Sequence, residues 1–299
     1  MVYSPFDFCF SANLYRNNSN NRREKREITS CLFIMKIQST QNIRIKNIQK
    51  LFTKSKERKE QNLFVIEGAR ELHLALAGSY LLDSVFICPE LFAETNYPEI
   101  QSEIQSTPLF EVSLPVFQKI AYREHSDGIL ALAKPQSHTL NDLNLSDNPF
   151  FIVLEAVEKP GNLGAILRTA DAAKVDAVIV CDPLTDVYNP NVIRSSVGCV
   201  FTVPLAISSQ SAAFSFLKER QIRIFAAELQ ASQEYQNTDF TQACALIMGT
   251  EAEGLTPFWI ERANARIKIP MRGKIDSLNV SVSTAILTFE AMRQRGFGK

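Results

Sequence analysis

The sequence predicts an α/β protein with two domains, the second of which is built on a parallel sheet. A chain of 299 residues is long enough for about two domains, and its 45% apolar residues are sufficient for two cores. Strand-like apolar runs alternate with helical patterns, which favours an α/β architecture. After a polar stretch at 135–148 the strands become more continuously apolar, as strands buried on both faces do. We therefore expect a smaller domain at 35–138 and a larger one at 148–299.

The smaller domain is expected to begin with a basic helical segment at 36–60. Within it, Ile43, Ile45, Ile48 and Leu51 lie at near-helical spacing. A helix is expected from the Glu67-Gly68 turn to Ala77, and another at 115–122. The expected strands are 62–66, 82–88, 109–113 and 128–133.

The larger domain is expected to be a doubly wound sheet that binds ligands at the carboxyl ends of its strands. A final helix is expected after residue 279. The expected strands are 150–156, 176–181, 200–206, 223–227, 243–248 and 266–271. The expected buried stripe of the final helix is Val282, Ile286, Phe289 and Met292.

The composition excludes several classes of protein. The 32 basic and 32 acidic residues balance, so a uniformly basic nucleic-acid coat is excluded, although local basic clusters are not. The six cysteines are scattered, without a Cys-x-x-Cys pair or a nearby histidine, which argues against a zinc site or a disulfide framework. No stretch approaches the roughly 20 apolar residues of a membrane span. We therefore expect a cytoplasmic protein with no metal and no membrane contact.

Residues 36–60 form a basic cluster, with eight lysines and arginines and only two glutamates. Such residues displace counterions from phosphates and supply sequence-independent affinity for RNA. A solvated amphipathic helix is the alternative, and the pattern leaves both interpretations open. The residues that we expect to contact RNA are Lys46, Lys50, Lys54, Arg58 and, further along the chain, Arg194.

The first of three motifs, residues 159–170, directly follows an expected strand. Asn162 is a suitable helix cap, and Gly164 and Arg168 share a face separate from the apolar face of the helix beyond it. We interpret the glycine as leaving room for a bulky group to reach the guanidinium. The alternative is that Arg168 only pairs with Asp171, an exposed interaction worth about a few tenths of a kcal/mol.

The second motif, residues 246–255, is a strand that runs into a glycine-bounded turn. It is not a P-loop, because Leu255 stands where a lysine would be needed. The acids Glu251 and Glu253 would repel phosphate, but a carboxylate at a strand end could bind a hydroxyl or a guanidinium, or help to hold a cation. A turn with solvated acids remains an equally open alternative.

The third motif, residues 269–287, joins an apolar run that ends at Pro270 to a helix that begins near Asn279. Hydroxyl side chains line the first turns of this helix. They are poor choices inside a helix, but they suit a helix start, where free N–H groups need acceptors. The motif therefore presents backbone groups, Ser277 and Asn279 to a small polar ligand, and we interpret it as a binding site.

Together the motifs resemble those of the SpoU (TrmH-like) family of RNA ribose 2′-O-methyltransferases, in the SPOUT superfamily. The resemblance covers 148–299 strongly, whereas 36–135 are more loosely similar to a ribosomal-protein-like substrate-binding domain. Each motif is weak alone, but their order and spacing are highly specific. The matching segments are Asn162-x-Gly164-x-x-x-Arg168, Gly249-Thr-Glu251-x-Glu-Gly254, Ile269-Pro-Met271, Ser277-Leu-Asn-Val-Ser281, and residues 188–198.

The resemblance implies a fold, a reaction and a set of site residues. The C-terminal parallel-sheet domain would contain a deep trefoil knot, with a smaller ribosomal-protein-like α/β domain before it. The protein would be a homodimer that transfers a methyl group from S-adenosylmethionine to a ribose 2′-hydroxyl of RNA. The implied catalytic residues are Arg168, Glu251, Asn162, Ser277 and Asn279, and the implied cofactor-binding residues are Gly249, Thr250, Ile269, Met271 and Leu278.

In-line methyl transfer needs alignment and help in removing a poorly acidic proton. A guanidinium keeps its proton up to about pH 12, so we expect Arg168 to clamp a phosphate and stabilise alkoxide charge. Residues 122–128 depart from the family's usual approach to the last strand of the first domain, which leaves the RNA target open. We favour 23S ribosomal RNA. The alternatives are transfer RNA, methylation of a base, and a non-catalytic RNA-binding protein on the same fold.

Residues 1–34 differ from the rest of the chain in composition and show no sustained periodicity. The apolar run at 31–35 is too short for a signal-peptide core, and Met35 is a natural start for the smaller domain. We expect either a disordered tail or an extension upstream of the true start. In the second case, N-terminal sequencing of native protein should return Met35, and a sequence that begins at Met1 would contradict it.

Overall fold

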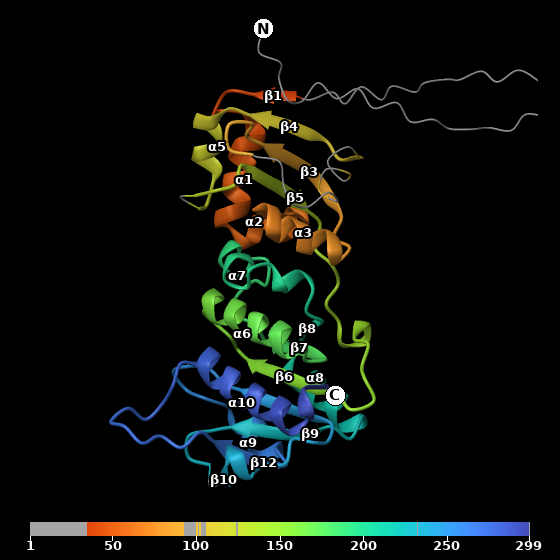
Figure 1. Ribbon diagram of the computed structural model, residues 1–299, viewed down its shortest axis with the longest axis vertical. Coiled ribbons are helices and arrows are strands. Elements are labelled where there is room, and N and C mark those ends of the chain that lie inside the picture. The colour runs from red at the N-terminus through yellow and green to blue at the C-terminus, as the bar shows by residue number, and fades with distance from the viewer. Residues whose placement is uncertain are drawn as a thin grey trace, which may run out of the picture.

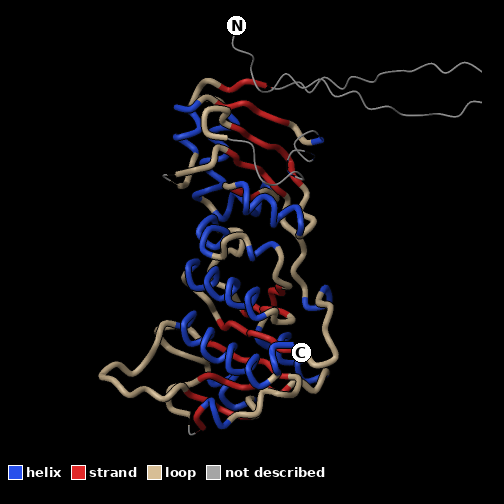
Figure 2. Tube along the Cα trace, in the orientation of Figure 1, coloured by secondary structure: helices blue, strands red, loops and turns tan. Residues whose placement is uncertain are grey.

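The chain forms two α/β units stacked end to end, which confirms the expected fold class (Figure 1). The N-terminal unit has a five-stranded sheet and the C-terminal unit a seven-stranded sheet. Helices flank both sheets (Figure 2). The expectation for residues 1–34 lies outside the described residues. The computed structural model describes residues 35–92, 100, 102, 106–123, 125–231 and 233–298.

The N-terminal sheet mixes parallel and antiparallel strands. Its strands are β1 (Met35–Ile37), β2 (Phe64–Glu67), β3 (Leu82–Ile87), β4 (Leu109–Val112) and β5 (Ile129–Ala133), and its helices are α1 (Ile43–Thr53), α2 (Ser55–Gln61), α3 (Ala69–Ala77) and α5 (Leu114–Ile120). The strand order is β1-β4-β3-β5-β2, and only β5 pairs antiparallel with its neighbours. The short β1 was not predicted, and the single expected helix at 36–60 is broken at Lys54, which caps α1 in an extended conformation.

The C-terminal sheet is parallel throughout, as the sequence predicted, in the order β10-β12-β9-β11-β6-β7-β8. Its strands are β6 (Phe150–Glu155), β7 (Ala177–Cys181), β8 (Leu205–Ser208), β9 (Arg223–Ala227), β10 (Gln233–Glu234), β11 (Cys244–Met248) and β12 (Ala265–Lys268). Its helices are α6 (Pro160–Ala173), α7 (Pro190–Ser195), α8 (Gln210–Glu219), α9 (Pro257–Arg262) and α10 (Val280–Gln294). The 3-10 turns of the chain are η1 (Leu140–Asp142), η2 (Cys199–Phe201), η3 (Tyr235–Asn237) and η4 (Gly296–Gly298). None of the described helices is long and apolar enough to cross a membrane.

Burial on both faces explains the continuous apolar strands of this sheet. In β6, Ile152 and Leu154 belong to the core beneath α6 and α10, whereas Phe151 and Val153 belong to the core beneath α8 and α9. Successive side chains of a strand point to opposite faces, so both alternating sets of a central strand are apolar. The exception in β6 is its last residue, the buried Glu155, which accepts hydrogen bonds from Thr256.

The structure departs from the sequence-based expectations at residues 200–206 and along α10. Residues 200–206 are not one strand, because Gly198 adopts a left-handed conformation and residues 199–201 then form η2, so that β8 starts only after Pro204. The expected buried stripe of α10 was wrong for Val282 and Phe289, whereas Ile286 and Met292 are partly buried and Met292 packs against the core. Val282 and Phe289 are 47% and 41% exposed, while the buried residues are Thr284, Leu287, Thr288 and Ala291.

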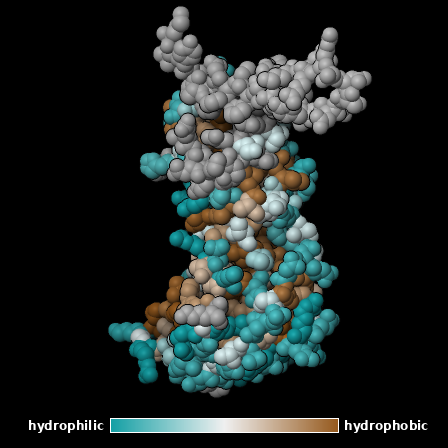
Figure 3. All heavy atoms as spheres, turned by 45° about the vertical axis from the view of Figure 1, so that its right-hand side comes forward, coloured by the Kyte–Doolittle hydropathy of each residue, from teal (hydrophilic) through white to brown (hydrophobic). Residues whose placement is uncertain are grey.

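The two units share one continuous apolar core. The ring of Phe64 stacks on Tyr188 of the C-terminal unit, with centroids 4.2 Å apart, and apolar side chains gather at the waist between the units (Figure 3). The buried Arg58 pairs with Asp186, Nε to Oδ2 at 2.7 Å. Since a buried charge is costly without its partner, these contacts fix the orientation of the units.

Gly164 allows α6 and α7 to approach closely. A Cβ at this position would overlap Ser195 Oγ and lie 2.7 Å from the backbone nitrogen of Ser196. The space beside the glycine is therefore filled by α7, and our interpretation that it gives a ligand access to Arg168 was wrong.

We expect Gly164→Ala to lower the free energy of unfolding by about 1–3 kcal/mol, because the added methyl group forces the two helices apart. Gly161→Ala is the matched control, since nothing lies within 4 Å of the Cβ position at Gly161 of the same helix. Urea denaturation followed by circular dichroism measures both variants. Equal effects of the two substitutions would show that the tight contact between α6 and α7 is not what requires Gly164.

Candidate functional site

The loops at the carboxyl ends of four adjacent strands, β12, β9, β11 and β6, surround two contiguous cavities. The larger, of about 420 Å³, lies between the loops after β9, β11 and β12 and the start of α10. The smaller, of about 160 Å³, lies between the loop after β11 and the start of α6. Both are lined by Met248, Gly249, Thr250, Glu251, Ala252 and Val280. This edge of the sheet is where the sequence predicted a ligand site.

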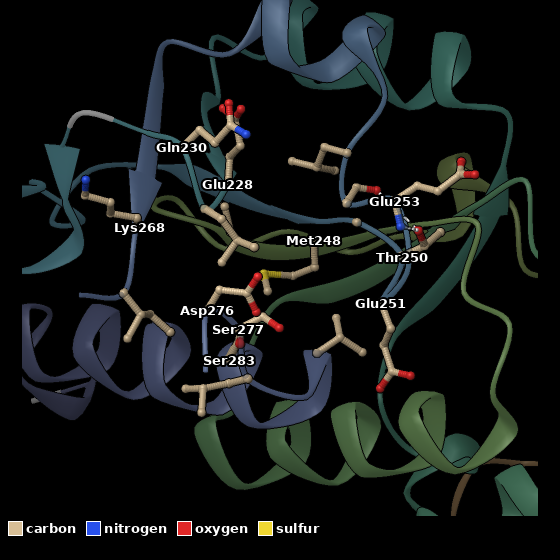
Figure 4. A pocket seen from close by; sticks show the side chains of 18 of the residues that line it. Glu228, Gln230, Met248, Thr250, Glu251, Glu253, Lys268, Asp276, Ser277 and Ser283 are labelled. Carbon is tan, nitrogen blue, oxygen red and sulfur yellow. Dashed lines mark hydrogen bonds between the residues drawn. The ribbon is translucent and has the colours of Figure 1, made fainter. Parts of the chain in front are cut away.

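Glu251 extends from the wall between the cavities toward α6 (Figure 4). Its Oε1 accepts hydrogen bonds from Nδ2 of Asn162, at 2.9 Å, and from Nδ2 of Asn279, and its other oxygen pairs with Lys159. Asn279 Nδ2 also lies 3.2 Å from Asn162 Oδ1. These residues come from all three motifs, so the structure brings together Asn162, Glu251 and Asn279 as expected. We call Lys159, Asn162, Glu251 and Asn279 the Glu251 cluster.

The orientation of the Asn279 amide follows from its second task as the helix cap of α10. Its Oδ1 accepts the backbone N–H and the hydroxyl of Ser281, at 3.0 and 2.6 Å. The amide NH₂ group therefore faces Glu251. Hydrogen bonds from Lys159 and then Asn162 hold the pKa of the Glu251 carboxyl below its ordinary value, so it is a carboxylate at neutral pH.

Glycines shape the turn that carries Glu251. Thr250 and Gly254 exchange two backbone hydrogen bonds, and Gly254 has a positive φ of 73°. A Cβ at Gly249 would overlap the backbone of Gly254 and Leu255. The hairpin can therefore close only with glycine at position 249, which leaves the backbone of the turn bare along the cavity wall.

The residues that the family resemblance assigns to the cofactor line the larger cavity. Gly249, Thr250, Ile269, Met271 and Leu278 all contribute to its wall, as does Ser277. Acidic residues dominate the charged part of the lining, with Glu228, Glu251, Glu253 and Asp276 against Lys268. Such a cavity suits a ligand with positive charge and apolar surface, and it disfavours a phosphate. Among the described residues, no group of three or more His, Cys, Asp or Glu could hold a metal ion.

Arg168 lies apart from this constellation. It lines neither cavity, its side chain is exposed on α6, and it makes no hydrogen bond or ion pair to a described residue, including Asp171. Its positive charge instead influences the thiol of Cys199 in η2. Burial raises the pKa of the Cys199 thiol to about 11, an effect that Arg168 and Arg70 partly oppose. One copy of the chain therefore does not place the arginine beside the Glu251 cluster.

The expected RNA contacts fall into two groups. Lys46, Lys50, Lys54 and Arg194 are exposed. Arg58 is only 5% exposed and is held by Asp186 and the Leu51 carbonyl oxygen, so the expectation that it contacts RNA was wrong. No local pattern signalled this burial, because the helix breaks at Lys54 and the partner Asp186 lies 128 residues away.

Lys159 is the member of the cluster that the sequence did not reveal as functional. Its side chain is 68% exposed, and only its ammonium group reaches Glu251. It stands directly before Pro160, the first residue of α6. Its place at the start of the first motif was the available signal.

Family comparison agrees with this geometry. Residues 149–289 match the model of the SpoU rRNA Methylase family, and residues 42–131 match that of an MRM3-like substrate binding domain. The 23S rRNA (guanosine(2553)-2′-O)-methyltransferase RlmP of Bacillus subtilis is 30% identical over 254 residues, covering 85% of this chain and 97% of the relative. The 23S rRNA (guanosine-2′-O-)-methyltransferase RlmB of Escherichia coli K12 is 36% identical over 224 residues, covering 69% and 92%.

Solved structures are similar over most of the chain. The crystal structure of an RNA 2′-O ribose methyltransferase has a TM-score of 0.76 and 38% identity, covering 87% of this chain and 99% of that chain. An AdoMet-bound rRNA methyltransferase from Sinorhizobium meliloti has a TM-score of 0.78 and 26% identity, covering 87% and 98%. With its three motifs meeting at one carboxylate beside a cavity, this chain belongs to the SpoU rRNA methylase family.

Proposed function

We propose that the protein methylates a ribose 2′-hydroxyl of 23S ribosomal RNA, with S-adenosylmethionine as methyl donor. The observation that carries this proposal is the Glu251 cluster, which joins all three motifs at the wall between two contiguous cavities. The relatives RlmP and RlmB, both named as 23S rRNA guanosine 2′-O-methyltransferases, support the choice of RNA.

The larger cavity fits the cofactor in chemistry. Its apolar wall of Met248, Leu255 and Ile269 suits an adenine ring, and its acidic groups, among them Glu228 and Asp276, favour the cationic donor. When bound, S-adenosylmethionine supplies a methyl group that its sulfonium makes electrophilic. Gly249, Thr250, Ile269, Met271 and Leu278 would hold the donor in this cavity.

The Glu251 cluster is assigned to positioning the ribose. The carboxyl of Glu251 has a lowered pKa, so it is a weak general base. Its Oε1 instead accepts from the amides of both Asn162 and Asn279 and keeps them in one orientation. The Lys159 side chain is 68% exposed, and its ammonium has further N–H donors for a ribose or phosphate oxygen. Ser277, on the wall of the larger cavity, is assigned to the ribose side of the donor.

A homodimer would supply the missing arginine. Val282 and Phe289 of α10 are 47% and 41% exposed, and α10 packs beside α6, which carries the exposed Arg168 (Figure 1). Exposed apolar side chains on one helix face favour a subunit interface. We assign to Arg168 of a second copy the task of clamping the target phosphate and stabilising the developing alkoxide.

The other expectations complete this proposal. Lys46, Lys50, Lys54 and Arg194 would contact RNA phosphates. The C-terminal segment would form a trefoil knot, consistent with the return of residues 269–279 to the cavity wall. The cytoplasm is the proposed location, because ribosomal RNA and the donor are both present there.

We expect Glu251→Gln to lower kcat about 100-fold. The glutamine amide keeps only one accepting oxygen, so its NH₂ group would oppose either the Lys159 ammonium or the asparagine donors and misplace the ribose. Transfer of radiolabelled methyl to 23S rRNA measures the rate. Glu261→Gln on α9, outside both cavities, is the matched control and should keep full activity. An unchanged kcat of the Glu251→Gln enzyme would contradict the assignment of Glu251 to positioning the ribose.

We expect Arg168→Lys to lower kcat at least about tenfold, because an ammonium lacks the two-pronged geometry of a guanidinium. The affinity for S-adenosylmethionine should stay the same, since Arg168 lies outside the cavity. Near-full activity of this variant would refute the clamp.

We expect a mixture of Arg168→Ala and Glu251→Gln subunits to recover up to about a quarter of wild-type activity after denaturation and refolding together. In a twofold dimer, half of the mixed molecules are heterodimers, and each of these would have one intact site. Absence of any recovery, with heterodimers confirmed by mass spectrometry, would place Arg168 and Glu251 of one site in the same subunit.

A further inference from the structure

An aromatic and basic surface lies where the N-terminal unit meets α7. We call its residues, Phe52, Tyr122, Arg123 and Arg194, the Tyr122 platform. The ring of Tyr122 stacks on Phe52 with centroids 5.8 Å apart and planes inclined by 13°, and Arg194 Cζ lies 6.0 Å from the centroid of Tyr122. All four residues border one small hollow. Tyr122 nevertheless remains 46% exposed.

Two buried carboxylates hold the platform in place. Glu67 accepts the backbone N–H groups of Tyr122 and Arg123, at 3.0 and 3.3 Å. Glu71, 1% exposed, accepts a hydrogen bond from the Arg123 guanidinium at 2.5 Å. Burying carboxylates is costly, and both of these hold the segment that carries an exposed ring, which points to a task for that ring. Core packing does not provide that task, because nearly half of the ring faces solvent.

The chemistry of the platform suits an unpaired nucleotide. Single-stranded RNA is recognised by stacking its bases on exposed aromatic rings while arginine or lysine contacts its phosphates. Arg194 is exposed beside the ring, and among the described charged residues that line the hollow the acid Glu67 is buried and already hydrogen-bonded. The surface therefore offers an aromatic face and free positive charge.

The platform lies close to the Glu251 cluster. Arg194 is followed by Ser195, whose Oγ is 3.4 Å from the carbonyl oxygen of Pro160. Pro160 in turn follows Lys159, which pairs with Glu251. The lengths of these covalent and hydrogen-bond steps add up to on the order of 15 Å, which is the largest possible distance between the Cα atoms of Arg194 and Lys159. A few nucleotides of one strand span that distance.

We infer that the Tyr122 platform binds an unpaired nucleotide of the RNA substrate, with the base stacked on Tyr122 and the adjacent phosphate paired with Arg194. This inference rests on the proposed RNA substrate. Residues 122–123 belong to the segment that departs from the family's usual sequence. The inference is that they select an unpaired nucleotide near the methylated ribose.

Fluorescence anisotropy of the full chain with a labelled single-stranded oligoadenylate of about 12 nucleotides tests the inference. Tyr122→Ala should weaken binding about tenfold, whereas Tyr122→Phe, which keeps the ring, should stay within about twofold. Binding of a labelled RNA duplex of the same length should change less than about twofold in both variants. Arg194→Ala should weaken single-strand binding. It should also lower by about one the number of phosphate contacts that the salt dependence of binding indicates.

Phe297→Ala is the matched control, because Phe297 is 61% exposed and lies at the C-terminal end of the chain. It should bind both RNAs as the wild type does. Equal single-strand affinity of Tyr122→Ala and wild type would overturn the inference, as would an equal loss for single strand and duplex. Calorimetric titration with S-adenosylmethionine distinguishes failure of the proposed function from failure of the platform. Wild-type protein that gives no heat contradicts the proposed function, whereas the RNA-binding measurements test the platform independently of it.

Discussion

The carboxylate of Glu251 is the interaction on which the site depends. Three segments that are far apart in the sequence meet there: the loop into α6, the hairpin after β11 and the start of α10. A parallel sheet brings the carboxyl ends of its strands to one edge, but it does not fix the side chains of the loops beyond them. One acceptor with three donors fixes them. Without it, a lysine and two amides would have to find new partners at a solvent-exposed edge.

The second constraint is the shared core of the two units. Tyr188 stacks on Phe64 and lies 3.2 Å from the Tyr80 hydroxyl, while its own hydroxyl also contacts His138 at 2.7 Å. Because these contacts are buried, the N-terminal unit is held rigidly over α6 and α7. A basic surface on one unit therefore keeps a constant distance from the reactive edge of the other. In the proposed function, this constant distance would let the protein select a position along an RNA strand.

Much of this could be predicted from the sequence, because local rules and global fold agree. The strands that form the centre of each sheet, and the meeting of Asn162 with Glu251 and Asn279, follow from apolar periodicity, strand-end loops and the family motifs.

The sequence-based expectations were wrong where the local sequence allows two arrangements and tertiary packing decides between them. The sequence of α10 offers two possible faces, and close packing on α6 buried the one with small threonines, Thr284 and Thr288. Arg58 was interpreted as a surface charge because its partner, Asp186, lies 128 residues away. Arg168 follows Asn162 by six residues, which places the two side chains on different sides of α6. Helical spacing therefore already separates Arg168 from the cluster, and only the family resemblance grouped them.

The central claim is that this geometry directs a methyl group to the ribose and not to a base. The most direct measurement is mass spectrometry of nucleosides from 23S rRNA that has been incubated with the protein and isotopically labelled S-adenosylmethionine. The account predicts a labelled 2′-O-methylnucleoside, formed by wild type and nearly absent with Glu251→Gln. Label on a base, or ribose methylation that does not depend on Glu251, would contradict it.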